Sequence, residues 1–376
     1  MTGGTPLASD RAAPASGRVV ISIDAMGGDR GPSAVVEGLA ISADKNPEIG
    51  FILHGDEAEL TRLVAAAPTL AGRCEIRGAE RVVTMHDKPS QVLRHGEGTS
   101  MWAAIEAVRT GEAAVAVSCG NTGALMALSM FRLRKLPGVN RPAIASFWPS
   151  RNPHEFNVML DMGADIKADA EDLLQYAVMG ASYARNALNL AEPRIGLLNV
   201  GTEDHKGRAE LRAAHEMIPT VAAAAGFRYV GFIEGSDILT DKVDVVVTDG
   251  FTGNVALKTA EGVARMFSDS IREAFGATLW SKAAAVLALP ALKRMSKRMD
   301  PRRSNGGVFL GLNGTVVKSH GSADGTGVAA AVKLAFRLAS SGFQDRVAAR
   351  VASALAAMQD AVPAAPAPAS GNGTTE

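Results

Sequence analysis

Three basic side chains beside glycine-rich segments could act on an anionic substrate. Lys258 lies one helical turn after Asn254 in the stretch VDVVVTDGFTGNVALK, and Lys318 and His320 end a late apolar segment just before Gly321. A lysine ammonium binds phosphate as a point charge, and a histidine exchanges protons near neutral pH. Lys258, Lys318 and His320 are therefore candidate catalytic residues for chemistry on a phosphate. A solvated lysine or a structural histidine is the ordinary alternative for each.

The backbone around these side chains repeats one pattern, in which an apolar strand runs into a glycine-containing turn and then a helix. The pattern follows residues 19–23, 115–118, 157–160, 195–200 and 243–248. Such turns offer backbone N–H groups at the carboxyl edge of a parallel sheet, where anions bind. We expect the five strand ends to converge on one phosphate-sized anion, held by the turn after 243–248. The candidate phosphate- or substrate-binding residues are Asp24, Gly27, Gly28, Asp29, Gly120, Asn121, Thr122, Gly123, Arg141, Asn199, Gly201, Thr202, Gly250, Phe251, Thr252, Gly253 and Asn254.

Four aspartates, Asp24, Asp29, Asp161 and Asp249, each follow an expected strand. An aspartate in this place ordinarily caps a helix or forms a turn. Four carboxylates would repel a phosphate unless they bond to cations or N–H groups. Asp249 could also position or deprotonate a protonated phosphate oxygen, which makes it the fourth catalytic candidate. Arg141 is either a bidentate ligand of phosphate or of the carrier protein's phosphopantetheine, or the partner of a nearby carboxylate.

Strand-like and helix-like segments alternate, which predicts an α/β fold with a mostly parallel sheet and helices on both faces. The folded domain is expected over 18–360, between a disordered extension at 1–17 and a disordered tail at 361–376. The expected strands lie near 18–24, 50–54, 73–77, 114–118, 143–147, 157–161, 194–200, 228–232, 243–248 and 315–319. The expected helices lie near 33–45, 57–66, 98–109, 123–134, 169–186, 207–225, 254–275, 280–298 and 326–358, the last broken near Gly342.

Residues 265–303 break this alternation and predict a helical hairpin that projects from the domain. Lys293, Arg294, Lys297 and Arg298 recur at a spacing that places them on one helix face. This basic face could dock an acidic carrier protein, or touch anionic lipid headgroups while nearby leucines enter the membrane interface. It could equally be a solvated face of a helix whose apolar side forms a dimer core. The sequence does not separate these readings.

Composition narrows the classes of function. The chain has 376 residues with 39 Lys plus Arg and 39 Asp plus Glu, a balance that gives no reason to expect nucleic acid. Two cysteines suit a reducing cytoplasm, and Cys119 is best explained as a small apolar filler. The seven histidines show no ligand spacing, so no metal is expected. The longest apolar run, 283–292, is half of the ~20 residues that a spanning helix needs.

Several motifs in one order identify a family. IDAMGGDRGP, GNTGALM, GVNRPA, LDMGAD, GLLNVGTEDHKG, VDVVVTDGFTGNVALKT and GGVFLGLNGTVVKSHGSAD together resemble the phosphate acyltransferase PlsX family of bacterial phospholipid synthesis. The resemblance covers about residues 18–355. That family is distantly similar to phosphotransacetylases, whose acyl-phosphate site resembles 249–258, and to the isocitrate dehydrogenase-like fold. Arg30-Gly31 stands where relatives often have His-Ala, so no histidine role carries over there.

The resemblance implies transfer of a fatty acyl group from acyl carrier protein to inorganic phosphate, without a cofactor. A membrane glycerol-3-phosphate acyltransferase would then use the acyl phosphate. It also implies a homodimer in the cytoplasm with a peripheral contact at the inner face of the membrane. Phosphate is already ionised and a thioester is activated, so positioning and oxyanion stabilisation could suffice for direct attack.

Two other functions remain open at this point. A nicotinamide-dependent dehydrogenase would share the fold class, but the G-x-G-x-x-A string at 325–330 does not leave a strand directly. A non-catalytic scaffold for lipid synthesis at the membrane surface would need the basic hairpin and not the glycine turns. Formation of acyl phosphate, reduction of nicotinamide, or liposome binding without turnover would separate the three.

Overall fold

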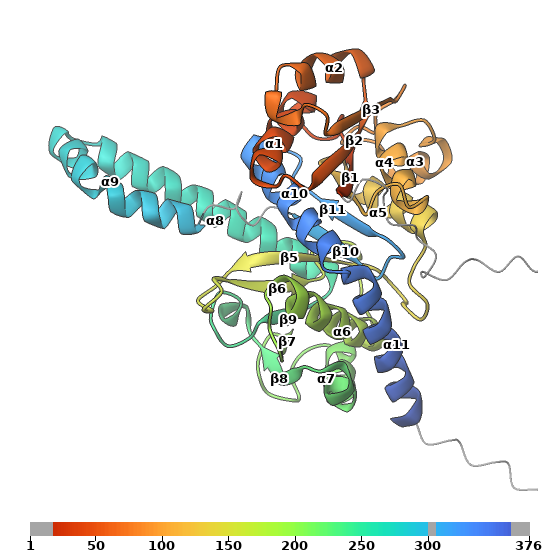
Figure 1. Ribbon diagram of the computed structural model, residues 1–376. Coiled ribbons are helices and arrows are strands. Elements are labelled where there is room, and N and C mark those ends of the chain that lie inside the picture. The colour runs from red at the N-terminus through yellow and green to blue at the C-terminus, as the bar shows by residue number, and fades with distance from the viewer. Residues whose placement is uncertain (1–17, 300–305, 362–376) are drawn as a thin grey trace, which may run out of the picture.

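The computed structural model describes residues 18–299 and 306–361, except the side chains of 293–299, 355 and 357–361. One sheet of eleven strands runs through this part of the chain, in the order β3-β2-β1-β4-β11-β10-β5-β6-β9-β7-β8 (Figure 1). The strands are β1 (Val19–Asp24), β2 (Ile49–Gly55), β3 (Cys74–Gly78), β4 (Val115–Ser118), β5 (Ala143–Pro149), β6 (Phe156–Leu160), β7 (Arg194–Leu198), β8 (Arg228–Ile233), β9 (Val245–Val247), β10 (Gly307–Leu310) and β11 (Thr315–Lys318).

Eleven α-helices of this part of the chain cover the sheet and extend from it. They are α1 (Gly31–Lys45), α2 (Glu57–Ala65), α3 (Pro89–His95), α4 (Ser100–Arg109), α5 (Thr122–Leu133), α6 (Ala170–Ala187), α7 (Ala209–Ala225), α8 (Gly250–Gly276), α9 (Leu279–Met299), α10 (Gly325–Ser340) and α11 (Phe343–Ala361). The α/β class and the mostly parallel sheet predicted from the sequence are confirmed, because seven of the ten strand pairings are parallel.

The three antiparallel pairings divide the sheet into two lobes. We call β3-β2-β1-β4-β11 with its helices the first lobe, and β6-β9-β7-β8 with its helices the second lobe. Antiparallel β10 and β5 lie between them. Three successive reversals make the parallel strands of one lobe run opposite to those of the other. Their carboxyl ends therefore lie at opposite edges of the sheet, so the predicted convergence of all five glycine turns on one point is wrong.

Helix packing ties the late part of the chain to both lobes. α10 packs on α1 and on strands of the first lobe, whereas α11 packs on α6 and α7 of the second. Figure 1 shows these two helices passing from the upper lobe to the lower one. The helix break predicted near Gly342 is confirmed, since this residue takes a left-handed φ of 62° between α10 and α11. That break lets one chain end stabilise both halves.

The sequence analysis did not predict β10 and α3, and it placed the start of α8 too late. β10 is four residues long between glycines, and α3 spans seven residues, so neither gives a clear periodic pattern. The turn predicted over 249–254 is helical, because Asp249 is the N-cap of α8 and Gly250 is its first residue. Asp249 accepts a hydrogen bond from the Thr252 N–H at 2.9 Å, which starts the helix earlier than its apolar pattern suggests.

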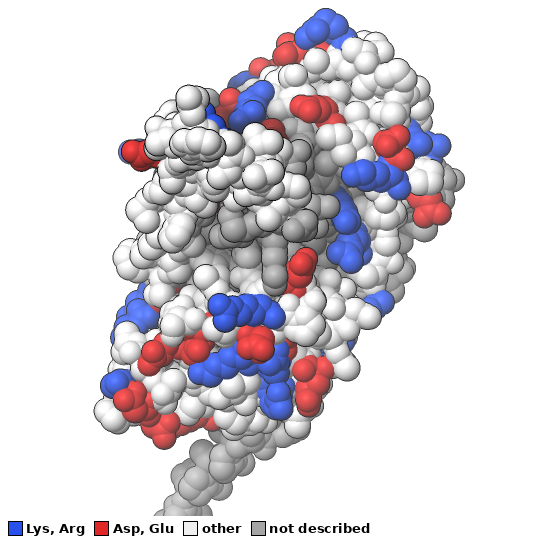
Figure 2. Space-filling model, turned by 90° about the vertical axis from the view of Figure 1, so that its left-hand side faces the viewer, with Lys and Arg blue, Asp and Glu red and all other residues white. Residues whose placement is uncertain are grey.

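α8 and α9 pack against each other and project from the body as a hairpin (Figure 1). The side chains of Leu279, Trp280 and Leu287 are 83–86% exposed. Figure 2, which looks onto the face from which the hairpin projects, shows charged side chains of both signs interspersed. The side chains of Lys293, Arg294, Lys297 and Arg298 lie outside the described part, as do residues 1–17 and the end of the predicted tail.

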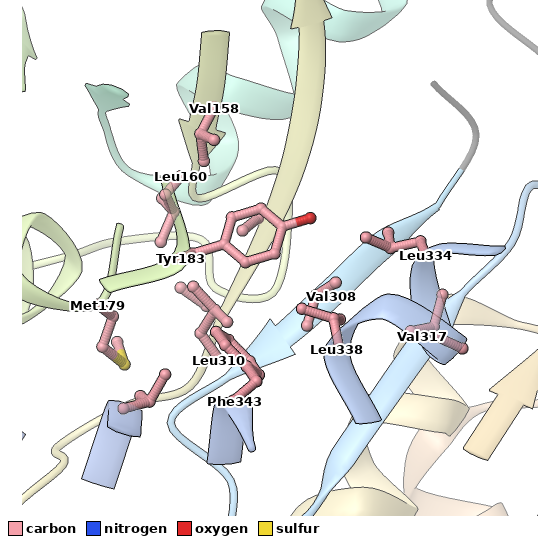
Figure 3. Packing of buried hydrophobic residues seen from close by; sticks show 14 of the residues in the cluster. Val158, Leu160, Met179, Tyr183, Val308, Leu310, Val317, Leu334, Leu338 and Phe343 are labelled. Carbon is pink, nitrogen blue, oxygen red and sulfur yellow. The ribbon is translucent and has the colours of Figure 1, made fainter. Parts of the chain in front are cut away.

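Tyr183 lies in the apolar core that joins α6, α11 and the middle strands (Figure 3). Its ring contacts Phe147 and Phe343 at centroid distances of 5.4 and 5.8 Å. Its hydroxyl is buried and has no hydrogen-bond partner among the residues that the structure describes. A buried polar group without a partner costs stability.

We predict that Tyr183→Phe leaves the free energy of unfolding unchanged or raises it by up to about 1 kcal/mol, because it removes only that hydroxyl. Tyr183→Ala should lose about 3–5 kcal/mol through the cavity it leaves. Urea unfolding of the three proteins measures both effects. A loss above about 1 kcal/mol in the phenylalanine variant would show that the hydroxyl is bonded.

Candidate functional site

Three chemically active residues end neighbouring strands of the first lobe at one level. Parallel pairing aligns Asp24 of β1 with Ser118 of β4, and Ser118 with Lys318 of β11. Residues in register on adjacent strands point to the same face of a sheet. The sequence separates these residues widely, but the fold places a carboxyl, a hydroxyl and an amine in one row.

Asp24 is buried and organises the turns beside it. Ser100 and Ser118 donate hydroxyl hydrogen bonds to its two oxygens at 2.7 and 2.6 Å, and the Gly27 N–H donates at 3.2 Å. The Gly120 N–H donates in turn to Ser118 Oγ. Burial raises the pKa of Asp24, although these donors oppose the rise. Asp24 thus holds the glycine turns together and is not itself placed to bind a phosphate.

The turns after β1, β4 and β11 pack closely against each other. Gly28 has a φ of 96°, and a Cβ there would lie 2.8 Å from the Cβ of Cys119 and 3.0 Å from the Gly321 carbonyl. The Asp29 N–H donates to that carbonyl at 2.8 Å. Only glycine accepts this backbone conformation without strain and leaves room for the approach. The structure therefore brings together the predicted phosphate-binding residues of the first lobe, among them Gly27, Gly28, Asp29 and Gly120.

Lys318 is almost fully buried among these turns. Its ammonium donates to the Cys119 carbonyl at 3.4 Å and also to the Ser319 carbonyl. Burial lowers the pKa of Lys318 from 10.5 to about 8, although the charges of Asp24 and Asp29 act to raise it. Among the described residues, its close partners are neutral carbonyls that leave the positive charge uncompensated, which suits an anionic ligand.

Helix N-termini add to the positive character of this edge. α1, α5 and α10 begin after β1, β4 and β11 respectively. Asn121 caps α5 by accepting from the Ala124 N–H, and it also holds the carbonyls of Met85 and Asp87. Thr122 and Gly123 form the first turn of α5. The partial positive charge of a helix N-terminus favours an anion nearby.

Lys258 and His320 meet at the junction of the two lobes, together with a residue that the sequence reading missed. The Glu261 carboxylate lies 3.1 Å from Lys258 Nζ and 3.7 Å from His320 Nε2. Burial lowers the pKa of His320, whereas Glu261 acts to raise it. Glu261 could have been noticed one turn after Lys258 on the same helix face. Three predicted catalytic residues, Lys258, Lys318 and His320, are thus close enough to interact electrostatically.

Asp249 and the turn after β9 belong to the other edge of the sheet. Burial alone would raise the pKa of Asp249, but the Thr252 N–H and the Arg208 guanidinium hold it below its usual value. Thr252 Oγ1 also donates to this carboxylate. With its oxygens engaged in a cap and an ion pair, Asp249 is poorly placed to act as a base.

Gly250–Asn254 pack against a second buried carboxylate, that of Asp161. A Cβ at Gly253 would lie 1.8 Å from the Asp161 carbonyl oxygen, and one at Gly250 would lie 2.5 Å from its Oδ2. Asp161 accepts backbone hydrogen bonds from Ile144, Gly163, Ala164 and Asp165. Burial raises the pKa of Asp161, and Asp249 is paired with Arg208, so both side chains are engaged in holding the start of α8 in place. The anion-binding role of this turn stays a prediction. Phe251 is exposed, with 63% of its surface accessible.

The remaining predicted ligands lie in the second lobe or, for Arg141 before β5, against it. Asn199 is buried and donates to the Lys206 carbonyl at 3.2 Å, so it shapes the following loop that contains Gly201 and Thr202. Arg141 forms an ion pair with Asp165 and lies 3.4 Å from Asp172. Of the two roles the sequence left open for Arg141, the structure shows the pairing with carboxylates.

The structure does not favour a thiol nucleophile or a dinucleotide-binding turn. Burial raises the pKa of Cys119, so its thiol is not poised as a nucleophile. The G-x-G-x-x-A string at 325–330 opens α10 under the cap of Asp324, and Gly325 packs against Glu37. Among the residues that the structure describes, no three His, Cys, Asp or Glu side chains gather as metal ligands. The same residues contain no helix long and apolar enough to cross a bilayer.

The fold is shared with solved phosphotransacetylases. A phosphotransacetylase from Streptococcus pyogenes aligns with a TM-score of 0.58 at 16% identity, covering 86% of this chain and 94% of that one. A branched-chain phosphotransacylase from Enterococcus faecalis gives a TM-score of 0.54 at 14% identity, covering 85% and 99%. Together with the basic cluster at the lobe junction, this defines the class as an α/β protein of phosphotransacetylase-like fold.

Sequence relatives narrow the class. A family model described as "Fatty acid synthesis protein" matches residues 19–346. Proteins named phosphate acyltransferase from Cereibacter sphaeroides and Paracoccus denitrificans are each 72% identical, over 92% and 90% of this chain and 94% and 92% of theirs. A phosphate acyltransferase from a Ruegeria species is 66% identical over 95% of this chain and 96% of its own. The chain belongs to the fatty acid synthesis protein family and, within it, groups with these acyltransferases; it is an acyltransferase.

The buried Lys318 generates a prediction about stability and pH. Its pKa is about 8 when folded and about 10.5 when unfolded, so between these values the unfolded chain binds an extra proton. The cost of burying the charge is full below pH 8 and disappears as pH rises toward 10.5. We therefore expect wild type to gain stability relative to Lys318→Met between pH 7 and pH 10, by on the order of 3 kcal/mol.

Urea unfolding of wild type and Lys318→Met at several pH values measures the difference between their free energies of unfolding. The titrations of groups that both proteins share cancel in this difference. Lys333→Met on the exposed face of α10 is the matched control and should show no such trend. A constant difference between wild type and Lys318→Met across this range would show that Lys318 is not a desolvated ammonium.

Proposed function

We propose that this acyltransferase moves a fatty acyl group from the thioester of acyl carrier protein to inorganic phosphate. The products are an acyl phosphate for phospholipid synthesis and the free thiol of the carrier protein. The observation that carries the proposal is the grouping of Lys318, His320 and Lys258 at the lobe junction, beside the N-termini of α1, α5 and α10. The relatives named phosphate acyltransferase support the choice of acceptor.

The proposed reaction needs no covalent enzyme intermediate. A phosphate oxygen attacks the thioester carbonyl carbon, and the carbonyl oxygen becomes an oxyanion in the tetrahedral intermediate. The carbon–sulfur bond then breaks, and the departing thiolate takes a proton. Lys318 and Lys258 would hold the phosphate, and His320 would donate to the oxyanion or protonate the thiolate. Asp24 would act only by keeping the surrounding turns in place.

The hairpin supports proposals about partners. Its exposed Leu279, Trp280 and Leu287 are large apolar side chains that a monomer in water leaves uncovered. We propose that a second copy of the chain or the inner membrane surface covers them, so that acyl phosphate is released near a membrane glycerol-3-phosphate acyltransferase. A protein in the cytoplasm that touches the membrane peripherally would fit this role.

A turnover assay tests the function directly. The full chain is incubated with acyl-acyl carrier protein and phosphate, without nucleotide or added metal. Acyl phosphate is trapped with hydroxylamine, and the free carrier thiol is measured in parallel. Equal amounts of both products are expected. Release of thiol without trapped acyl phosphate would indicate simple hydrolysis and would overturn the proposal.

We predict that Lys258→Met raises the KM for phosphate about 10- to 100-fold, because one charge-assisted contact with the anion is lost. The KM for the carrier-protein thioester should change much less. Steady-state kinetics with each substrate varied in turn measures the two constants. Lys333→Met serves again as control, and an unchanged phosphate KM in Lys258→Met would remove Lys258 from the phosphate site.

A further inference from the structure

Glu261 bridges the lobes at the position where the proposed chemistry takes place. It lies on α8 of the second lobe, and its Oε1 is 3.7 Å from Nε2 of His320, which follows β11 of the first lobe. Its Oε2 is 3.1 Å from Lys258 of the same helix. The Glu261 side chain is only 26% exposed, so water screens this carboxylate less than it would at an open surface.

The His320 ring is constrained from two sides. Its Nδ1 accepts a hydrogen bond from the Ser322 N–H at 3.3 Å and lies 2.9 Å from Ser322 Oγ, while its Nε2 faces Glu261. A histidine with one nitrogen engaged has its tautomer and ring orientation set by that contact. Ser322 belongs to the same loop as His320, whereas Glu261 belongs to the opposite lobe.

Charges from both lobes act on the His320 ring. Burial lowers its pKa, Glu261 and Asp29 act to raise it, and Lys258 and Lys318 act to lower it. Among the charges that favour the protonated form, Glu261 has the largest effect. Removing Glu261 would take away the largest charge that favours the protonated ring, while burial and the two lysines would still favour the neutral ring.

We propose that Glu261 is a positioning residue, which orients His320 across the lobe junction and keeps a proton on its Nε2 for acyl transfer. This inference rests on the proposed function. It makes the correct placement of His320 depend on the approach of the two lobes, because the carboxylate and the ring belong to different lobes. Glu261 itself touches no reacting atom in this scheme.

The experiment compares wild type with Glu261→Gln, which keeps the size of the side chain and removes its charge. Asp269→Asn is the matched control, because Asp269 pairs with Arg272 at 3.5 Å on the same helix, away from His320. The His320 ring is followed by NMR titration and assigned by its absence from the spectrum of His320→Gln. Steady-state constants are measured for the same proteins, and Glu261→Asp tests partial rescue.

In Glu261→Gln we expect the titration midpoint of His320 to fall by half a unit or more, on the order of what one nearby charge contributes. The kcat should fall about 10-fold, with a smaller change in the phosphate KM, as for a group that acts on the transition state. Glu261→Asp should recover part of both, and Asp269→Asn should match wild type.

An unchanged His320 midpoint in Glu261→Gln would overturn the proposal, as would an equal shift in Asp269→Asn. A lowered midpoint with unchanged kcat would also overturn it, because Glu261 would then act on a histidine that the reaction does not use. Failure of the proposed function is distinguishable, since wild type would then form no acyl phosphate. Failure of this inference leaves wild type active.

Discussion

The site depends on a buried ammonium held by neutral groups. Lys318 at the end of β11 is in register with Ser118 of β4, which is in register with Asp24 of β1. Strand pairing therefore fixes the positions of all three residues along the strands. Its nearest partners are the carbonyls of Cys119 and Ser319, which bind the charge without neutralising it. Such an arrangement costs stability, and proteins commonly retain costs of this kind where an anionic ligand is bound.

Tight packing of the turns maintains this arrangement. Asp24 gathers donors from Ser100, Ser118 and Gly27, and the missing side chain of Gly28 lets the first turn touch the third. Because these contacts are mutual, movement of one turn would disturb the surroundings of Lys318. The buried carboxyl of Asp24 is thus a structural centre for a cationic site, which explains how an aspartate can lie beside a proposed phosphate site without repelling the ligand.

The second lobe reaches the lobe junction through α8. Strand direction reverses three times between β11 and β6, so the start of α8 lies at the far edge of the sheet. The path from Gly250 to Glu261 spans about 16 Å of helix, which brings Lys258 and Glu261 to His320. The same helix continues into the projecting hairpin (Figure 1), so one rigid element connects the lobe junction to the exposed apolar surface.

The sequence determined the elements and the types of the reactive residues, because both are local properties. Hydrophobic period and glycine turns predicted the α/β class and ten of the strands, and the order of motifs indicated the family that the relatives confirm. The motifs also singled out Lys258, Lys318 and His320, together with Asp249, as catalytic candidates. The tertiary structure decided which turns meet, since that depends on strand direction and on the antiparallel β10, which is too short to show a pattern. It also paired Asp249 with Arg208, 41 positions away, and placed Glu261 beside His320, 59 positions away. No local pattern specifies contacts between residues so far apart in sequence.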